Sequence, residues 1–216
     1  MRFVKAPIST SCKKVSRTDQ AGFDLRQTQS TSSVAPCHAS VLEQVFAQCF
    51  EDRWNTRLHG GASEPYYQPA SSAQLTHSLF YREDFFASAL HEIAHWCIAG
   101  RERRLLPDFG YWYAPEGRSA QEQADFEAAE CKPQALEWIF SRACNYRFRP
   151  SIDNFQDDGE MPDTRAFRQH IVEQVIHWQF AGLPERAMIF FTALSGVYGN
   201  DVSFQALTFN ADQLDS

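Results

Sequence analysis

The sequence contains no apolar run long enough to cross a bilayer, which takes about 20 consecutive residues in a helix. Its opening residues, MRFVKAPISTSCKK, also lack the continuous apolar block of a secretory signal. We therefore expect no membrane association and a cytoplasmic location.

Cysteine pairs of the CxxC type are absent, and the six cysteines follow no regular spacing. A chain of 216 residues, 44% of them hydrophobic, can bury a sizeable core without disulfide bonds. We therefore predict reduced thiols. Cys49, Cys97 and Cys131 fall in helix-like segments, where they are expected to pack as small buried hydrophobic residues.

Basic residues are in deficit, 20 against 27 acidic ones, for a net charge of −7. Because binding to phosphates needs a concentrated positive face, this balance argues against a nucleic acid partner. Residues 1–40 carry six basic and two acidic side chains, net +4, which leaves 14 basic and 25 acidic ones, net −11, for residues 41–216. The N-terminal segment and the rest of the chain therefore differ in charge.

The first 39 residues are rich in Ser, Thr and Gln and show no hydrophobic periodicity. We predict a disordered N-terminal tail over residues 1–39 and one domain over residues 40–216. Apolar residues at helical spacing predict the first helix over 41–53, with Ser40 and Glu43 as a capping box at its start.

The stretch 55–72 predicts a loop with short extended pieces, because it contains Gly-Gly and two prolines. A strand is predicted over 75–82. The second helix follows, with Asp84 as its N-cap and Gly100 as the left-handed residue that ends it. The aromatic segment FGYWYA, 109–114, is typical of a strand.

A second capping box, Ser119 and Glu122, opens a long helix to about Asn145, which Pro133 must kink or divide. Two further helices are predicted, one capped by Asp163 and one that begins at Pro184 and ends at Gly199. The first of these is expected to bury Phe167, Ile171, Val175 and Trp178. The fold class is therefore α+β, a helix-rich single domain with a few short strands.

The second helix carries the motif HEIAH, which matches the metal-binding pattern H-E-x-x-H at His91, Glu92 and His95. Residues i and i+4 lie on one face of a helix, so both imidazoles can bind one cation. Glu92 lies a little around the helix, where it can reach a metal-bound water without being a ligand. The pattern therefore predicts a divalent metal site.

A third ligand is needed, and the metzincin histidine is absent because Arg101 stands in its place. A later helix offers Glu130, one turn before Pro133, where a kink could turn its carboxylate inward; Glu127 is the alternative. Two histidines and a carboxylate can bind zinc, which activates a water molecule, or iron(II), which keeps coordination positions open for dioxygen. The motif predicts a metal and leaves the reaction open.

The residues around the motif carry a more specific signal. HEIAHWCIAG, DFGYWY and KPQAL, together with WNTRL at 54–58 and SIDNF, resemble the bacterial elongation factor P hydroxylase family. The resemblance runs from about Val41 to residue 208. It implies a fold similar to H-E-x-x-H metallopeptidases and hydroxylation of a lysine of elongation factor P that already carries a β-lysyl group.

The resemblance also implies a site. His91, His95 and Glu130 would be the metal ligands, with iron(II) as the metal, dioxygen as co-substrate and elongation factor P as the protein partner. Glu92 would orient water or the substrate amine, whereas it would be the general base of a zinc metallopeptidase, which is the alternative function. A third hypothesis is a binding module in which the metal is structural.

Residues for the substrate can be suggested from its chemistry. Tyr111 and Tyr113, with the tryptophan between them, would line a groove for the aliphatic arm of a lysine or would belong to the core. The modified lysine carries two amines that are protonated near neutral pH, so Glu92, Glu116 and Glu127 could supply a negative pocket.

A basic run follows the HEIAH helix directly. Arg101, Arg103 and Arg104 would either meet an acidic protein surface or form a solvated run at the end of the helix.

Overall fold

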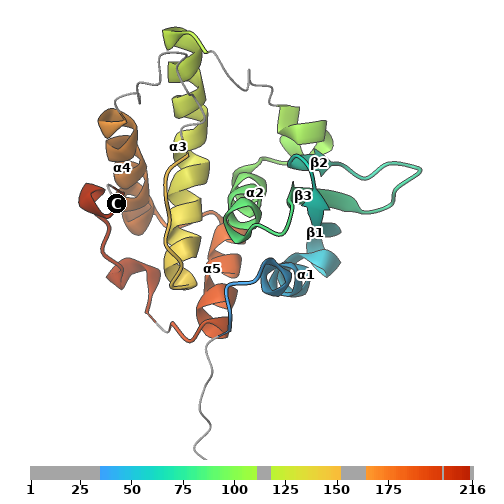
Figure 1. Cartoon of the computed structure of the whole chain (residues 1–216). Helices are drawn as coiled ribbons and strands as arrows, with labels where there is room; N and C mark the ends of the chain where they lie inside the picture. Colours follow the sequence, from blue (N-terminus) through green and yellow to red (C-terminus); the bar gives the residue numbers. More distant parts are fainter. Residues whose placement is uncertain (1–34, 111–117, 152–163, 201, 215–216) are drawn as a thin grey trace, which may run out of the picture. The chain divides into compact units, whose positions relative to one another are not determined.

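The computed structural model describes residues 35–110, 118–151, 164–200 and 202–214, and Figure 1 shows their arrangement. Within these ranges the chain forms a helix-rich α+β domain with one small sheet. None of the described helices is long and apolar enough to span a membrane. The helices are α1 (Ala39–Trp54), α2 (Phe86–Ile98), α3 (Ala120–Ala143), α4 (Arg165–Ala181) and α5 (Glu185–Val197).

The sheet has three strands, β1 (Thr56–Ala62), β2 (Tyr66–Gln68) and β3 (His77–Arg82), in the order β1-β3-β2. β1 runs parallel to β3 and β2 runs antiparallel to it. The predicted strand over 75–82 is confirmed by β3. The stretch predicted as loop with extended pieces contains β2 and the seven-residue β1, because β3 supplies hydrogen-bond partners for both.

An aromatic cluster fixes the position of α2. Trp96 is fully buried, and its ring lies 4.7 Å from Phe50 and 5.1 Å from Phe46, both in α1. Phe190 of α5 packs on the same rings. In Figure 1, α2 consequently lies between the sheet on one side and the long α3 on the other. One face of α2 is held in the core, and the opposite face is turned to α3.

Three predicted helix caps are wrong. α1 begins at Ala39, one residue before Ser40, and has no side-chain cap at its start. α2 begins at Phe86 with no side-chain cap from Asp84, and it ends at Ile98, where Ala99 is extended instead of Gly100 being left-handed. Arg186 and Arg104 supply donors to the last carbonyl groups of α2, so no left-handed glycine is required there.

The capping box at the start of α3 is confirmed. The backbone N–H of Glu122 donates to Ser119 Oγ at 3.3 Å, and the backbone N–H of Ser119 donates to Glu122 Oε2 at 2.8 Å. α3 then continues through Pro133 to Ala143 as one helix, so the proline does not divide it. A single long helix therefore carries the carboxylates that face α2.

The remaining predictions have mixed outcomes. The four residues expected to be inward in α4 (Phe167, Ile171, Val175 and Trp178) are buried. Asp163 lies outside the described residues, as do residues 111–114 of the predicted strand 109–114. Phe109 and Gly110 belong to a 3-10 turn, η2 (Pro107–Gly110), because Phe109 stacks on Tyr67 at 4.4 Å instead of pairing with the sheet. All the described cysteines are free thiols.

Short 3-10 turns complete the described chain: η1 (Arg103–Leu105) after α2, and η3 (Phe204–Ala206) and η4 (Ala211–Leu214) near the end. η3 and η4 place Phe204 and Leu214 in the core. Among the cysteines predicted to pack in helices, Cys97 is buried, and Cys49 and Cys131 are half-buried against the core.

Candidate metal centre

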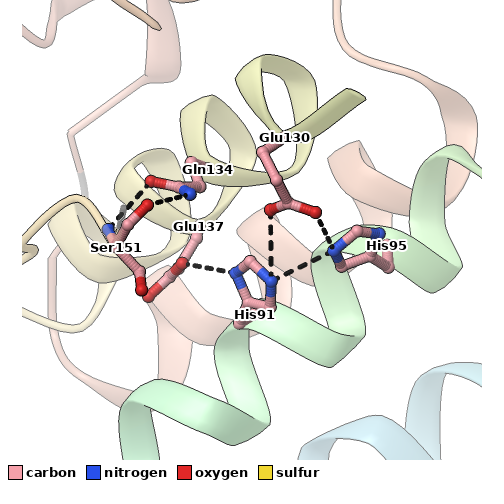
Figure 2. A network of polar contacts seen from close by, with 6 residues as sticks. All are labelled: His91, His95, Glu130, Gln134, Glu137 and Ser151. Atoms are coloured by element: carbon pink, nitrogen blue, oxygen red, sulfur yellow. Dashed lines mark hydrogen bonds and ion pairs between the residues drawn. The ribbon is translucent and has the colours of Figure 1, made fainter. Parts of the chain in front are cut away.

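Three side chains from two helices meet on the face that α2 turns toward α3. The Nε2 atoms of His91 and His95 lie 3.0 Å apart. Glu130 of α3 lies above them, with Oε2 3.4 Å from His91 Nε2 and Oε1 3.2 Å from His95 Nε2. Figure 2 shows these atoms converging on one point. Among the described residues, this is the group of His, Cys, Asp and Glu side chains whose geometry suits a metal ion.

The local structure explains why these side chains meet. His91 and His95 are one helical turn apart in α2, so their rings lie side by side on one face, in an edge-to-face arrangement with centroids 4.7 Å apart. Trp96 and Ile93 point into the core on the other side of the helix and prevent its rotation. Glu130 is 4% exposed and belongs to the part of α3 that packs on α2. Tertiary packing therefore adds the carboxylate to the local histidine pair.

The distances fit a metal ion. Ligand atoms that bind one zinc or iron ion at about 2.0–2.1 Å lie roughly 2.9–3.4 Å from one another, for octahedral to tetrahedral angles. The three contacts of 3.0, 3.2 and 3.4 Å fall in that range. Glu130 Oε2 is also buried without a hydrogen-bond partner, which is costly unless a cation faces it. The donor set therefore fits a divalent metal.

Glu137, which the sequence analysis did not place in the site, orients His91. Its Oε2 lies 2.9 Å from His91 Nδ1, and its side chain comes from α3 two turns after Glu130. A carboxylate accepts here, so Nδ1 carries the proton and Nε2 of the neutral ring presents a lone pair to the metal position. The seven-residue spacing from Glu130 places both carboxylates on one face of α3, and this signal could have identified Glu137.

Comparison with known proteins identifies the family of the chain that carries this site. The sequence model for elongation factor P hydroxylase matches residues 45–209. The chain is also 46% identical over 166 residues to the elongation factor P lysine hydroxylase of Haemophilus influenzae, an alignment that covers 77% of this chain and 92% of that protein. The chain belongs to the elongation factor P hydroxylase family. It is therefore a member of a family of enzymes, and the three converging side chains lie inside the matched region.

The electrostatics of this hydroxylase-family site are dominated by His91 and Glu130. Burial disfavours a charged His91, but the hydrogen bond to Glu137 and the charges of Glu130, Glu137 and Glu92 outweigh it and raise the pKa of His91 to about 10. Burial likewise disfavours a charged Glu130, yet His95 and His91 lower the pKa of its carboxyl to about 2. The site therefore holds a cation next to Glu130, as a proton on His91 or as a metal ion.

Glu92 lies beside this centre and has no hydrogen bond to it in the described structure. Its half-buried carboxylate lines a cavity of about 600 Å³ together with His91 and Glu137, which we call the Glu92 cavity. Burial raises the pKa of Glu92, and the two histidines lower it in part. Arg82 and Arg149 also line this cavity. Glu92 is therefore positioned to contact a molecule that reaches the metal from the His91 side.

The other predicted site residues stand apart from the centre. Glu127 is half-buried and accepts a hydrogen bond from Gln123 Nε2 at 2.9 Å. It lies one turn before Glu130 in α3 and is not among the side chains that converge with the histidines. Tyr111, Tyr113 and Glu116 lie outside the described residues. The roles predicted for these four residues stay predictions.

Proposed function

We propose that this chain hydroxylates the β-lysyl-modified lysine of elongation factor P, with an iron(II) ion held by His91, His95 and Glu130. One observation carries the proposal: a donor set of two imidazoles and one buried carboxylate converges in a chain that belongs to the elongation factor P hydroxylase family. The Haemophilus influenzae relative is described as a lysine hydroxylase of the same factor.

Iron(II) suits the reaction better than zinc because hydroxylation is an oxidation. One atom of dioxygen enters a C–H bond and the other leaves as water, which consumes two electrons and two protons from a reductant. A bound iron(II) ion with two histidines and one carboxylate would supply open positions for dioxygen and for electron transfer. Zinc has no redox chemistry and would instead activate water.

The residues of the chain would hold and orient the reactants. His91 and His95 present Nε2 lone pairs, and Glu137 fixes the ring of His91 through Nδ1. The carboxylates of Glu92 and Glu137 in the Glu92 cavity would attract the protonated amines of the modified lysine. The amine-bearing arm would therefore approach the metal from the His91 side.

The test is a single-turnover experiment. The protein is reconstituted with iron(II) without oxygen, mixed with β-lysylated elongation factor P and ascorbate as the reductant, and exposed to air. Intact mass spectrometry should then show a gain of about 16 Da, the mass of one oxygen atom, with the wild-type protein and none with His91→Ala. A wild-type sample that gains no oxygen would contradict the proposal.

Zinc-dependent peptide hydrolysis is the second candidate, and the position of Glu92 favours it. This residue follows the first histidine of the motif and lines the cavity beside it, as the general base of a peptidase would. Glu92→Gln should abolish hydrolysis by several orders of magnitude if it is that base. In the hydroxylase we expect Glu92→Gln to raise KM for the modified factor, with Glu173→Gln, an exposed carboxylate of α4 outside the Glu92 cavity, as the matched control.

A further inference from the structure

A second cavity opens on the other side of the metal centre. It has a volume of about 720 Å³, and His95 forms part of its wall. The end of α2, the start of η1, α3, α4 and the residue before α5 contribute the rest of the lining. We call it the His95 cavity. Its size is that of a pocket for a small molecule or for a few inserted side chains.

The lining of the His95 cavity is basic. Arg101, Arg103 and Lys132 are exposed and line it, whereas Glu102 is the one carboxylate among its described lining residues. Arg101 and Lys132 form no ion pair with another described residue. In a chain with a net charge of −7, this places a local excess of positive charge directly beside His95.

The carbonyl groups at the end of α2 do not cancel this charge. They would present the negative end of the helix to the cavity. However, Arg186 Nη2 donates to Cys97 O at 3.0 Å, and Arg104 Nη1 donates to Ala99 O at 2.7 Å. Two guanidinium groups therefore neutralise the negative end of α2 behind the cavity wall. The side chains that line the cavity then determine the sign of the charge inside it.

The two cavities beside the metal centre thus differ in charge. The Glu92 cavity brings two carboxylates to the His91 side, and Arg82 and Arg149 in its lining balance them, whereas the His95 cavity brings three cationic side chains against one carboxylate. A protonated amine would be repelled from the second. The His95 cavity therefore suits a ligand of opposite sign from the lysine arm.

We propose that the His95 cavity binds a carboxylate next to the metal centre. This inference rests on the proposed function, because the His95 cavity lies beside the reacting groups only if the metal centre is where hydroxylation takes place. Guanidinium groups form two-point contacts with carboxylates, and Lys132 adds a charge from α3 across the cavity. The carboxylate belongs either to a free small acid or to an Asp or Glu side chain of the protein substrate.

The first arm of the experiment measures binding without turnover. Succinate, 2-oxoglutarate and citrate are titrated calorimetrically into the purified protein, with and without added zinc(II). Saturable binding should weaken at least about tenfold in the double variant Arg101→Gln/Lys132→Gln, because two charge-assisted contacts are lost. Glu102→Gln should bind more tightly, since the one carboxylate of the lining is removed.

The matched control removes two positive charges elsewhere. Arg53 and Arg57 are exposed, pair with Glu185 and Glu51, and do not line the His95 cavity. Arg53→Gln/Arg57→Gln changes the net charge equally, so it should leave the affinity for small acids within about twofold of wild type.

The second arm distinguishes the source of the carboxylate. If no small acid binds, the affinity for β-lysylated elongation factor P should fall at least about tenfold in Arg101→Gln/Lys132→Gln and remain unchanged in the control, which assigns the site to a side chain of the substrate. Small acids that fail to bind, together with unchanged affinity for the factor, would overturn the proposal.

The experiments distinguish a failure of the hydroxylase proposal from a failure of the carboxylate-site proposal. If wild-type protein binds a small acid but adds no oxygen to the factor, the carboxylate site stands and the hydroxylase proposal falls. If oxygen is added but both binding arms are negative, the hydroxylase proposal stands and the carboxylate site falls.

Discussion

At the scale of single residues, the arrangement around His91 favours a cation, either a proton on Nε2 or a metal ion. Glu137 accepts the proton on Nδ1, so Nε2 of a neutral His91 presents a lone pair to the lone pairs of Glu130 Oε2 at 3.4 Å. Two acceptors that face each other in a buried position repel, and Glu130 Oε2 has no other hydrogen-bond partner. A metal ion at this point satisfies both atoms at once.

The contact between Glu137 and His91 gives the first prediction. Glu137→Gln keeps an acceptor for Nδ1 but removes the charge, so we expect zinc(II) affinity to fall about tenfold, and Glu137→Leu about a hundredfold. A competition titration against a chromophoric chelator measures both values. Glu127→Gln, in the same helix but away from the centre, is the control and should match wild type. If wild type and Glu137→Leu bind zinc(II) with equal affinity, Glu137 does not orient His91 for metal binding.

At the scale of elements, α2 is held in place by a residue far away in the sequence. Arg186 in α5 is 8% exposed, donates to carbonyl groups at the end of α2 and lies with Cζ 4.5 Å from the ring centroid of Trp96. Burial lowers its pKa to about 10, which leaves it protonated at neutral pH. This side chain therefore links α5 to the helix that carries both histidines.

The second prediction follows from that link. Arg186→Ala leaves the Cys97 carbonyl without a charged donor, leaves the Ala99 carbonyl with Arg104 alone and removes the contact with Trp96. We therefore expect the free energy of unfolding to fall by roughly 2–4 kcal/mol. Urea unfolding followed by fluorescence measures the change. Arg53→Ala removes a guanidinium group that also lies over a tryptophan but is 62% exposed, and it should cost less than about 1 kcal/mol. Similar losses in the two variants would contradict the proposed role of Arg186.

The helix ends show which features the sequence could reveal. The Ser119 and Glu122 capping box was predicted correctly because all its partners lie within four residues. The end of α2 was predicted wrongly because its carbonyl groups are satisfied from Arg186, 87 and 89 residues away. The residues of β1 were predicted as part of a loop with short extended pieces, because their partner β3 lies beyond a turn-rich stretch. A local pattern is therefore correct at Ser119 and misleading at Ser40, and contacts from distant parts of the chain leave no local signal.

The residues of the candidate site also divide into those that a local pattern predicts and those that depend on tertiary packing. His91 and His95 were predicted as a pair because one helix places them together. Glu130 was chosen over Glu127, and the structure brings Glu130 to the histidines. Glu137 was missed because its contact with His91 spans 46 residues and depends on how α2 and α3 pack. The seven-residue spacing places Glu130 and Glu137 on one face of α3, and the packing of α3 on α2 brings that face to the histidines.

At the scale of the whole molecule, the described domain begins before the first helix. Tyr198 Oη donates to Pro36 O at 3.3 Å, and Cys37 Sγ contacts Cys144 O at 3.9 Å. These contacts tie residues 36 and 37 to the helical part of the domain. The predicted boundary between tail and domain at residue 40 therefore leaves out residues that contribute to packing.

The third prediction uses these contacts. A chain that starts at residue 35 keeps them, and we expect its Tm to stay within about 2 °C of the full-length value. A chain that starts at Ser40 loses both contacts and the first residue of α1, and its Tm should fall by several degrees. Differential scanning calorimetry measures both. A large loss on removing residues 1–34 would show that the predicted disordered tail contributes to the fold.

The fourth prediction concerns the coupling of metal binding to the stability of the domain. Because α2 and α3 each contribute side chains to the candidate metal centre, a metal ion bound there would link them only in the folded chain. A free concentration of one hundred times Kd stabilises the folded state by about 2.7 kcal/mol, which corresponds to a rise in Tm of about 5–10 °C for a domain of this size. The rise should be seen with zinc(II), which avoids oxidation during heating.

Two variants make this prediction specific. Glu130→Gln removes the ligand from α3 and should abolish most of the rise in Tm on adding zinc(II), whereas Glu127→Gln should retain it. Removing the buried carboxylate also changes the metal-free protein, so the comparison is made within each variant, with and without metal. If zinc(II) raises the Tm of Glu130→Gln as much as that of wild type, the ion binds elsewhere, and the link between α2 and α3 through the metal does not exist.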